Sequence, residues 1–410
     1  MESKKERELH AQQSPFSRRE MLRGLPALAA AAATTVGTAQ AQTGQIIAYV
    51  GAYTNRARGI HSYFVNPSDG TLTAGNVLTG LPNPSSLAVH PNKKYIYAIN
   101  EIGNFAGSTN GSVTSISVDA GTGDLKIMNV VSSQGAGPAH VSVDPSGKWV
   151  FAANYGGGSA AVLPILPDGS LGAAADVARI SGPLGRQPAD DAPPGSFAIS
   201  GHDAPHAHMA QTDLAGNYLF VADLGTDRIY IYKFDKVTGK LTPNDQPFLQ
   251  ASSGAGPRHF DFHPNGRWAY AITEEASTML YLTYDASKGS LEIKQSASTL
   301  PETFTGTNFP SAVMLSADGR FLYGANRLYD SVVIFAINAE GWMIRAGDEW
   351  TRGSYPRDIA IEPNGNFMYV LHSRSDNVTS FQVDKNTGLL SFTGQFLPLG
   401  NPSRMVFLTL

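Results

Sequence analysis

A two-strand motif recurs six times along this chain, and this repeat constrains the fold more than any other feature of the sequence. Each copy contains an alternating apolar run, a turn built on Pro, Asp, Asn and Gly, and a second run rich in Tyr, Phe, Val and Ile. That order is typical of a β-hairpin. Successive copies begin 46 to 69 residues apart, a spacing that indicates stacked repeats. The copies occupy residues 84–101, 138–155, 207–224, 257–274, 310–327 and 356–373.

A second motif, an Asx/Gly turn followed by a short apolar run, lies between the hairpins and occurs seven times. Seven turns against six hairpins imply a seventh hairpin whose strands are far apart in the sequence. Residues 402–410 match its first strand and residues 46–53 match its second. Such a unit closes a ring and removes exposed sheet edges. We therefore predict an all-β, seven-bladed β-propeller with four antiparallel strands per blade, whose last blade joins one C-terminal strand to three N-terminal strands.

Residues 1–41 precede the repeats and are typical of a twin-arginine export signal. Arg18 and Arg19 stand before an apolar, alanine-rich run that ends at Ala39-Gln40-Ala41, a sequence suited to signal peptidase. The run is shorter than the ~20 residues that a membrane-spanning helix requires, although a short anchoring helix is the alternative. We expect a signal peptide over 1–41 and a single propeller domain over 42–410. Export by the twin-arginine machinery implies a periplasmic or secreted protein without stable membrane insertion.

Composition excludes several other classes of protein. The 410 residues include no cysteine, which excludes disulfide frameworks, cysteine-ligated metals and thiol catalysis. A formal net charge of −4 argues against a nucleic-acid binder, whose domain would be basic. Only 16% of the residues are charged and 42 are glycine, which favours many short strands joined by tight turns. A closed ring has no obligatory partner surface, so we expect a monomer.

The geometry of a propeller predicts where a site would lie. In each blade the innermost strand begins at the end of the ring at which the second strand finishes, so these positions converge on one mouth of the central channel. Small or apolar residues are the usual choice at such strand ends, yet the aligned hairpins have charged and amide side chains at these positions. The sequence thus predicts a polar pocket with both signs of charge. Its members include Glu101, Asn154, His208, Asp223, Arg258, Glu274, Asn326 and Arg327.

Four segments of the chain resemble the lactonase family of seven-bladed β-propellers, which includes propeller-type 6-phosphogluconolactonases and fungal carboxy-muconate cycloisomerases. The segments are 49–54, 204–232, 254–274 and 310–327, and their most specific parts are the sequences PHAH and GPRH. The resemblance covers nearly all of the chain after residue 41. It implies a catalytic set composed of His208, Arg258, Glu274 and Arg327.

These residue types permit the hydrolytic opening of a lactone. His208, with an ordinary imidazole pKa of about 6.5, is expected to act as base to water and then as acid to the leaving alkoxide. Arg258 and Arg327 are expected to hold an acid group of the substrate or to stabilise the oxyanion. Glu274 is expected to orient His208 or Arg258, or to be the base itself. Water and an ester-like bond suffice, so we expect no cofactor and no metal.

Residues 181–205 are rich in Pro, Gly, Asp and Ala and depart from the repeat. A connection of this length in a compact domain is usually functional or disordered. We expect a flap over the channel mouth, with Arg186 as a contact for an anionic substrate, and a plain surface insertion is the alternative. Further substrate contacts are expected from His206, Glu101, Asn154, Asp223 and Asn326.

The histidines allow a second interpretation. His202, His206 and His208 are metal-ligand candidates, but their spacing is loose and no carboxylate triad accompanies them. His90 and His263 precede proline in hairpin turns and are expected at the surface.

The proposed catalytic residues also have structural interpretations. Arg258 and Glu274 would form an ion pair within one blade, Arg327 would form one between blades, and His208 would bond to the backbone of its strand. The leading prediction is hydrolysis of a sugar-derived or anionic lactone at the channel mouth, as in 6-phosphogluconolactonase. A non-catalytic exported propeller that binds a small ligand or a protein is the alternative, and a lactone-forming cycloisomerase is the third possibility.

Overall fold

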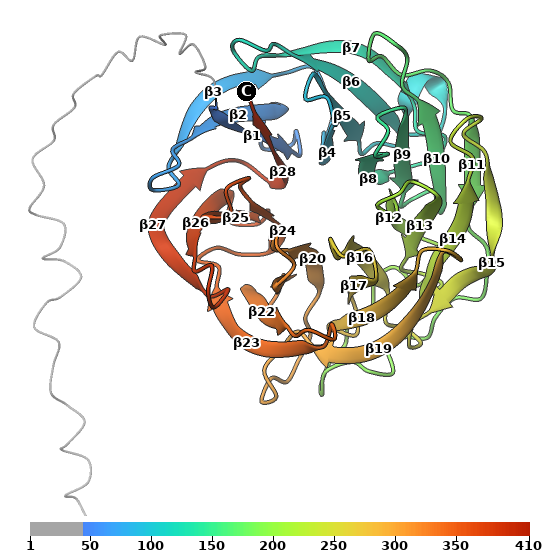
Figure 1. Ribbon diagram of the computed structural model, residues 1–410, viewed down its shortest axis with the longest axis vertical. Coiled ribbons are helices and arrows are strands. Elements are labelled where there is room, and N and C mark those ends of the chain that lie inside the picture. Colours follow the sequence, from blue (N-terminus) through green and yellow to red (C-terminus); the bar gives the residue numbers. More distant parts are fainter. Residues whose placement is uncertain (1–43) are drawn as a thin grey trace, which may run out of the picture. The chain divides into compact units, whose positions relative to one another are not determined.

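The computed structural model describes residues 44–410, and the strands in this range form seven four-stranded antiparallel sheets around a common axis (Figure 1). The predicted signal segment 1–41 lies outside the described residues. Besides the strands, one turn of 3-10 helix spans Phe105–Gly107. No helix within 44–410 has the length and apolar character needed to cross a bilayer.

Six blades follow the order of the chain from the innermost strand outward. Blade 1 contains β4 (Ser86–Val89), β5 (Tyr95–Asn100), β6 (Ser112–Val118) and β7 (Leu125–Ser132), and blade 2 contains β8 (Pro138–Val143), β9 (Trp149–Asn154), β10 (Ser159–Pro164) and β11 (Asp176–Arg179). Blade 3 contains β12 (Ala207–Thr212), β13 (Tyr218–Asp223), β14 (Arg228–Phe234) and β15 (Leu241–Gln250), and blade 4 contains β16 (Pro257–Phe262), β17 (Trp268–Thr273), β18 (Thr278–Asp285) and β19 (Ser290–Ser298). Blade 5 contains β20 (Pro310–Leu315), β21 (Phe321–Asn326), β22 (Ser331–Ile337) and β23 (Met343–Trp350), and blade 6 contains β24 (Pro356–Ile361), β25 (Phe367–His372), β26 (Asn377–Val383) and β27 (Leu390–Pro398).

The closing blade has the strand order β28-β1-β2-β3, with β1 (Ile46–Ala52), β2 (Ile60–Val65), β3 (Leu72–Leu78) and β28 (Pro402–Thr409). The innermost strand β28 pairs with β1 in a register that runs from Ile46 opposite Thr409 to Ala52 opposite Pro402. The predicted seven-bladed propeller, with its last blade assembled from both ends of the sequence, is therefore confirmed.

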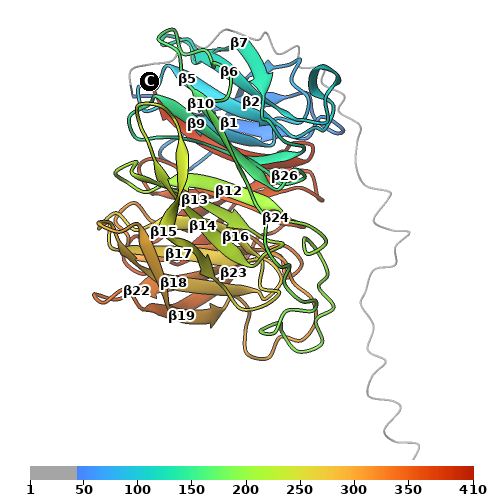
Figure 2. The same ribbon diagram turned by 90° about the vertical axis from the view of Figure 1, so that its right-hand side faces the viewer.

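The hydrophobic core lies between neighbouring blades, because each sheet packs both of its faces. Strands β9, β21 and β25 are buried at every residue, as expected for strands covered on two sides. One cluster, for example, joins Trp149 and Phe151 of blade 2 to Leu219 and Val221 of blade 3. Figure 2 shows the strands of blade 3 beside those of blade 4. The outer strands alternate largely between half-buried and exposed residues, as β27 does.

A tyrosine on the second strand of five blades donates a hydrogen bond to a turn carbonyl of the adjoining blade. The acceptor is a glycine in each case, and Gly388 shows why, because its φ of 74° lies in the region that favours glycine. In blades 2 and 3 the equivalent positions hold Phe151 and Phe220. The bonds run from Tyr49 to Gly123 at 2.6 Å, Tyr97 to Gly169 at 3.0 Å, Tyr270 to Gly341 at 2.8 Å, Tyr323 to Gly388 at 3.0 Å and Tyr369 to Gly70 at 2.8 Å.

The two turn histidines belong to the same inter-blade contacts. His90 and His263 were expected at the surface, and this expectation is wrong, because both are buried. Nε2 of His90 lies 2.9 Å from the carbonyl oxygen of Gly147, and Nε2 of His263 lies 3.0 Å from that of Gly319. The proline after each histidine marks the turn correctly but says nothing about the neighbouring blade that covers it.

Tyr323→Phe is expected to lower the free energy of unfolding by about 1–3 kcal/mol, because the buried Gly388 carbonyl loses its donor. The aromatic ring itself is tolerated at this position, as Phe151 and Phe220 show. Urea unfolding measures the change. Tyr218→Phe is the matched control, since its hydroxyl is exposed, and equal unfolding midpoints for the two variants would contradict the role of the bond.

Candidate functional site

The polar cluster lies on the axis of the ring, at the end where the inner strands begin. A cavity of about 20 Å³ there is lined by residues of β4, β8, β12, β16, β24 and β28, which are six of the seven inner strands. Among its lining residues are His208, Arg258 and Arg357. A volume of this size has room for about one water molecule.

Glu274 joins two arginines at this end of the ring. Its Oε2 lies 2.8 Å from Nε of Arg258, which starts β16 of the same blade, and 2.6 Å from Nη2 of Arg327, which follows β21 of blade 5. The three side chains are only 2%, 10% and 7% exposed for Arg258, Glu274 and Arg327. Burial opposes ionisation of Glu274, but Arg327 and Arg258 outweigh it and hold its pKa below the usual range. One carboxylate faces two guanidinium groups, so one positive charge of this trio is uncompensated.

Backbone carbonyls fix both guanidinium groups in place. Nε of Arg327 donates to the Phe309 carbonyl at 2.8 Å, and Nη1 of Arg258 donates to the Ser311 carbonyl. Burial and the nearby Arg327 lower the pKa of Arg258 to about 9, so that it remains protonated at neutral pH. The ion pairs expected within and between blades are thus formed, and the same contacts hold two cationic guanidinium groups rigidly, one of which, Arg258, lines the axial cavity.

His208 bonds to a second histidine and not to its own strand. Its Nδ1 lies 3.2 Å from Nε2 of His259, and that nitrogen lies 3.4 Å from Nη1 of Arg258. A guanidinium can only donate, which favours Nε2 of His259 as an acceptor whose one lone pair is shared by Arg258 and by a proton on Nδ1 of His208. The lone pair of His208 is then on Nε2. This tautomer is the one that a base acting through Nε2 requires.

The pKa of His208 departs from the ordinary value that the sequence suggested. Burial lowers it well below 6.5, and the positive charges of Arg258, Arg357 and Arg327 lower it further. Burial, and after it the charge of Arg258, also lowers the pKa of His259 well below 6.5. Both imidazoles are therefore neutral at physiological pH.

Residues 181–205 contact the catalytic candidates directly. The hydroxyl of Ser200 lies 3.3 Å from Oε1 of Glu274, and its amide donates to Glu275 at 2.8 Å. The side chain of His202 is fully buried between Asp227, at 2.9 Å, and Glu275, at 3.1 Å. This segment is thus anchored over Glu274, and its opening and closing as a flap stays a prediction.

A second charged group lies on the opposite arc of the ring, on blades 6 and 1 and the closing blade (Figure 1). Arg357 at the start of β24 approaches Glu101, which follows β5, with 3.7 Å between Nη2 and Oε2. The Tyr53 hydroxyl lies between them and donates to Glu101 at 2.6 Å. Burial raises the pKa of Tyr53 to about 12, so this hydroxyl keeps its proton. Of these residues only Glu101 was predicted to contact substrate.

Three other predicted contacts, Asn154, Asp223 and Asn326, are fully buried. Their side chains bond to the backbone of nearby connections, and this burial disfavours a direct contact with substrate. Nδ2 of Asn154 donates to the Ser133 carbonyl at 2.9 Å, Oδ1 of Asp223 accepts from the Thr226 amide at 2.9 Å, and Nδ2 of Asn326 donates to the Thr299 carbonyl at 2.9 Å.

The remaining candidates lie at the edge of the cluster. His206 stacks on Tyr155 with 4.2 Å between ring centroids, and its Nε2 lies 2.8 Å from Asp203. Arg186 is 68% exposed and pairs with Asp190 at 3.1 Å, and no contact within 44–410 joins it to Glu274. Its contact with substrate stays a prediction. In the part of the chain that the structure describes, no three His, Asp or Glu side chains are grouped as metal ligands.

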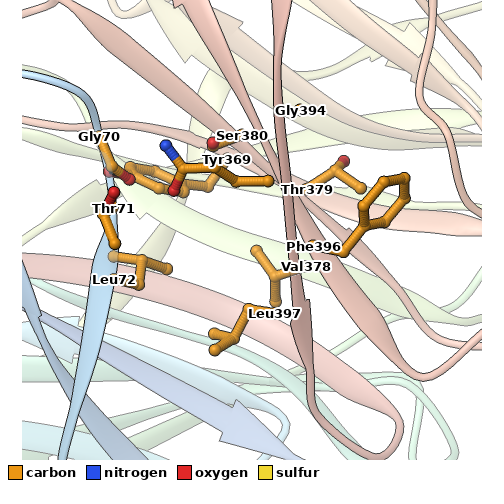
Figure 3. A pocket seen from close by; sticks show the side chains of 11 residues that line it. Gly70, Thr71, Leu72, Tyr369, Val378, Thr379, Ser380, Gly394, Phe396 and Leu397 are labelled. Carbon is orange, nitrogen blue, oxygen red and sulfur yellow. Dashed lines mark hydrogen bonds between the residues drawn. The ribbon is translucent and has the colours of Figure 1, made fainter. Parts of the chain in front are cut away.

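Larger hollows lie elsewhere, and the residues that line them do not include His208, Arg258 or Glu274. A groove of about 430 Å³ separates blade 6 from the closing blade, and Figure 3 shows Tyr369, Val378 and Phe396 among its lining residues. It contains no charged side chain. A cavity of about 640 Å³ at the far end of the axis is lined by apolar side chains together with Asp144 and Asp213, and it shares His140 and Arg404 with the small cavity.

Comparisons with known proteins agree with this architecture. A family model described as "Lactonase, 7-bladed beta-propeller" matches residues 47–407. The chain is 31% identical over 366 residues to a 6-phosphogluconolactonase of Bacillus subtilis, covering 88% of this chain and 98% of that one. It is also 29% identical to a 6-phosphogluconolactonase of Formosa agariphila, with 88% and 99% covered. The structure of a periplasmic gluconolactonase of Pseudomonas aeruginosa superposes with a TM-score of 0.79 at 30% identity, with 89% and 99% covered.

Proposed function

Because this chain belongs to the lactonase family of seven-bladed β-propellers, we propose that it hydrolyses a sugar-derived or anionic lactone at the channel mouth, beside the small axial cavity. The observation that carries the proposal is the pair of fixed guanidinium groups, Arg258 and Arg327, that share Glu274 beside His208. Relatives named 6-phosphogluconolactonase and gluconolactonase support the substrate class.

The reaction needs only water and the side chains of the cluster. Water gives a proton to Nε2 of His208 while its oxygen bonds to the lactone carbonyl carbon. The carbonyl oxygen becomes an oxyanion, which N–H groups of Arg258 and Arg327 stabilise. The ring C–O bond then breaks, and the alkoxide takes the proton from His208 to give a hydroxy acid. The lowered pKa of His208 makes its imidazolium an effective acid for this last step.

The electrostatics assign Glu274 a positioning role. Its pKa is held below the usual range, so it is a weak base, and both of its neighbours are cations. It holds Arg258 and Arg327 in fixed orientations. The uncompensated positive charge of the trio favours substrates that are anionic or that become anionic in the transition state.

We also propose that the protein acts outside the cytoplasm, which the Arg18-Arg19 signal and the periplasmic gluconolactonase relative support. A phosphorylated lactone is made inside the cell, so unphosphorylated δ-gluconolactone is the first substrate to test. Freshly dissolved lactone is added to the purified protein and acid release is followed at constant pH. A rate equal to spontaneous hydrolysis with both δ-gluconolactone and 6-phosphogluconolactone would refute the enzymatic proposal and favour a binding-only propeller.

The pH profile tests the role of His208. We expect kcat/KM to stay constant as the pH falls through 6.5, because burial and the nearby arginines hold the pKa of this base well below that value. Activity falls only at lower pH, where the imidazole binds a proton and cannot accept another. Initial rates between pH 4.5 and 7.5, corrected for spontaneous hydrolysis, provide the measurement, and a break at about 6.5 would contradict the assignment.

His208→Gln accompanies this profile and is expected to lower kcat/KM by about 10²-fold or more. His61→Gln is the matched control, since its imidazole lies on β2 of the closing blade. Equal activity of the two variants would remove His208 from the mechanism.

A further inference from the structure

The group of Arg357, Glu101 and Tyr53 makes no contact with the reacting atoms in the steps above. We infer that it is a second subsite, which binds neighbouring hydroxyl groups of a polyhydroxylated lactone through one charged donor and one charged acceptor. This inference rests on the proposed function and deepens it, because it selects sugar-type lactones over simple ones.

The protein holds the subsite from three blades. Nε of Arg357 donates to the hydroxyl of Ser403 at 2.8 Å, and its Nη2 donates to the hydroxyl of Tyr53 at 2.5 Å. Oε2 of Glu101 accepts from the hydroxyls of Tyr53 and Ser85, both at 2.6 Å. Four bonds between side chains thus fix one face of the guanidinium and one oxygen of the carboxylate before any ligand binds, which reduces the entropy cost of binding.

The other side of each group is open. Within residues 44–410, Nη1 of Arg357 and Oε1 of Glu101 have no hydrogen-bond partner, and neither is a fully covered atom. The two side chains are 18% and 27% exposed. In contrast, Arg258 is 2% exposed and Arg327 is 7% exposed. Among these arginines, Arg357 is the one whose side chain is most available to a ligand.

Charge decides which ligand group suits the subsite. The charges of Arg357 and Glu101 balance, with 3.7 Å between Nη2 and Oε2. A phosphate or carboxylate bound there would be attracted by the guanidinium and repelled by the Glu101 carboxylate. A hydroxyl group is both donor and acceptor. Two neighbouring hydroxyls can therefore give one hydrogen bond to Glu101 and accept one from Arg357. An anionic or developing negative charge instead belongs at Arg258 and Arg327, where positive charge is in excess.

The location connects the subsite to the reacting groups. Arg357 lines the same small cavity as His208 and Arg258, and it extends from β24 of blade 6, two blades along the ring from Arg258 on β16. A lactone whose carbonyl lies at Arg258 would thus direct its hydroxyl-bearing carbons toward Arg357 and Glu101. Hydroxyls bound there would orient the carbonyl for attack.

The test compares two lactones of the same ring size, δ-gluconolactone with hydroxyl groups and δ-valerolactone without them. We expect Glu101→Ala and Arg357→Met to lower kcat/KM for δ-gluconolactone at least 30-fold, mainly through KM. For δ-valerolactone the loss is expected to stay below threefold. Equal losses with both lactones would overturn the subsite, because they would indicate a structural role.

Arg352→Met is the matched control, since Arg352 forms a comparable pair with Glu349 at 2.7 Å next to the outer strand β23. Thermal melting of each variant reports any loss of folding.

A second readout needs no catalysis: saturation-transfer NMR with the neutral polyol D-glucitol should detect binding to the wild type and not to Glu101→Ala. Polyol binding without lactonase activity would uphold the subsite and refute the proposed function. If the wild type does not bind glucitol, or if Glu101→Ala binds it equally well, the subsite is overturned whether or not the protein is a lactonase.

Discussion

Arg258→Met is expected to lower kcat/KM for δ-gluconolactone by about 10²–10³-fold, the loss typical when one preorganised oxyanion donor is removed. The effect is large because the Arg258 fork is rigid: Glu274 and the Ser311 carbonyl hold it, and the side chain is 2% exposed. The kcat/KM of Arg258→Lys should lie between that of Arg258→Met and that of the wild type, since an ammonium keeps the charge but lacks the planar guanidinium geometry.

Arg345→Met is the control for this prediction, because Arg345 pairs with Asp348 on β23, far from the axial cavity. It should retain wild-type kinetics. The initial-rate assay separates two roles, since a transition-state donor lowers kcat whereas a substrate anchor raises KM. Wild-type kcat/KM in a folded Arg258→Met protein would rule out both roles.

The architecture could be predicted from the sequence because its unit is local. Each hairpin is encoded within 18 residues, such as 84–101, by a turn between two alternating runs, and the count of turns against hairpins located the split blade. The positions of Arg258, Glu274 and Arg327 followed from the same alignment, since strand ends converge in any closed ring. Residues whose positions depend only on the regular geometry of the repeat could thus be located from the sequence.

The parts of the site that the sequence did not predict depend on contacts between elements. Ser200 and His202 lie in a segment without a repeat to align, so nothing linked them to Glu274 and Glu275. His259 follows Arg258 in the GPRH sequence, and only the structure shows that it holds His208. Likewise, the pKa of His208 depends on burial and on arginines from three other blades.

A residue's position at a strand end does not reveal whether its side chain is exposed or buried. Asn154 and Glu101 occupy neighbouring positions of the same repeat, yet Asn154 is fully buried and Glu101 is 27% exposed. The difference arises because the amide bonds to the backbone of a neighbouring connection, whereas one carboxylate oxygen stays free. Arg357 follows the proline that begins β24, as Arg258 follows the proline that begins β16, but its open face could not be predicted from the sequence.

His202→Gln is expected to cause the largest loss of stability. The imidazole is fully buried between Asp227 and Glu275, whose side chains are 1% and 0% exposed. Removing the cation leaves both carboxylates buried without it, which costs about 3–5 kcal/mol. Asp227 also accepts the amides of Gly254 and Gly256, at 2.6 and 2.9 Å, so the effect extends to the connection that leads into β16.

The pH dependence distinguishes this ion pair from ordinary packing. Burial alone would lower the pKa of His202, but Asp227 and Glu275 outweigh it and raise the pKa to about 10 from its ordinary value of 6.5. A raised folded-state pKa means that the stabilisation is fully present below pH 6.5 and is lost as the pH rises toward 10. Urea unfolding at pH 6, 8 and 10 should therefore show the wild type and His202→Gln converging. His61→Gln should show no such convergence. Curves for wild type and His202→Gln that stay equally far apart at all three pH values would mean that His202 is neutral in the folded protein, and that packing rather than charge anchors residues 181–205 over Glu274.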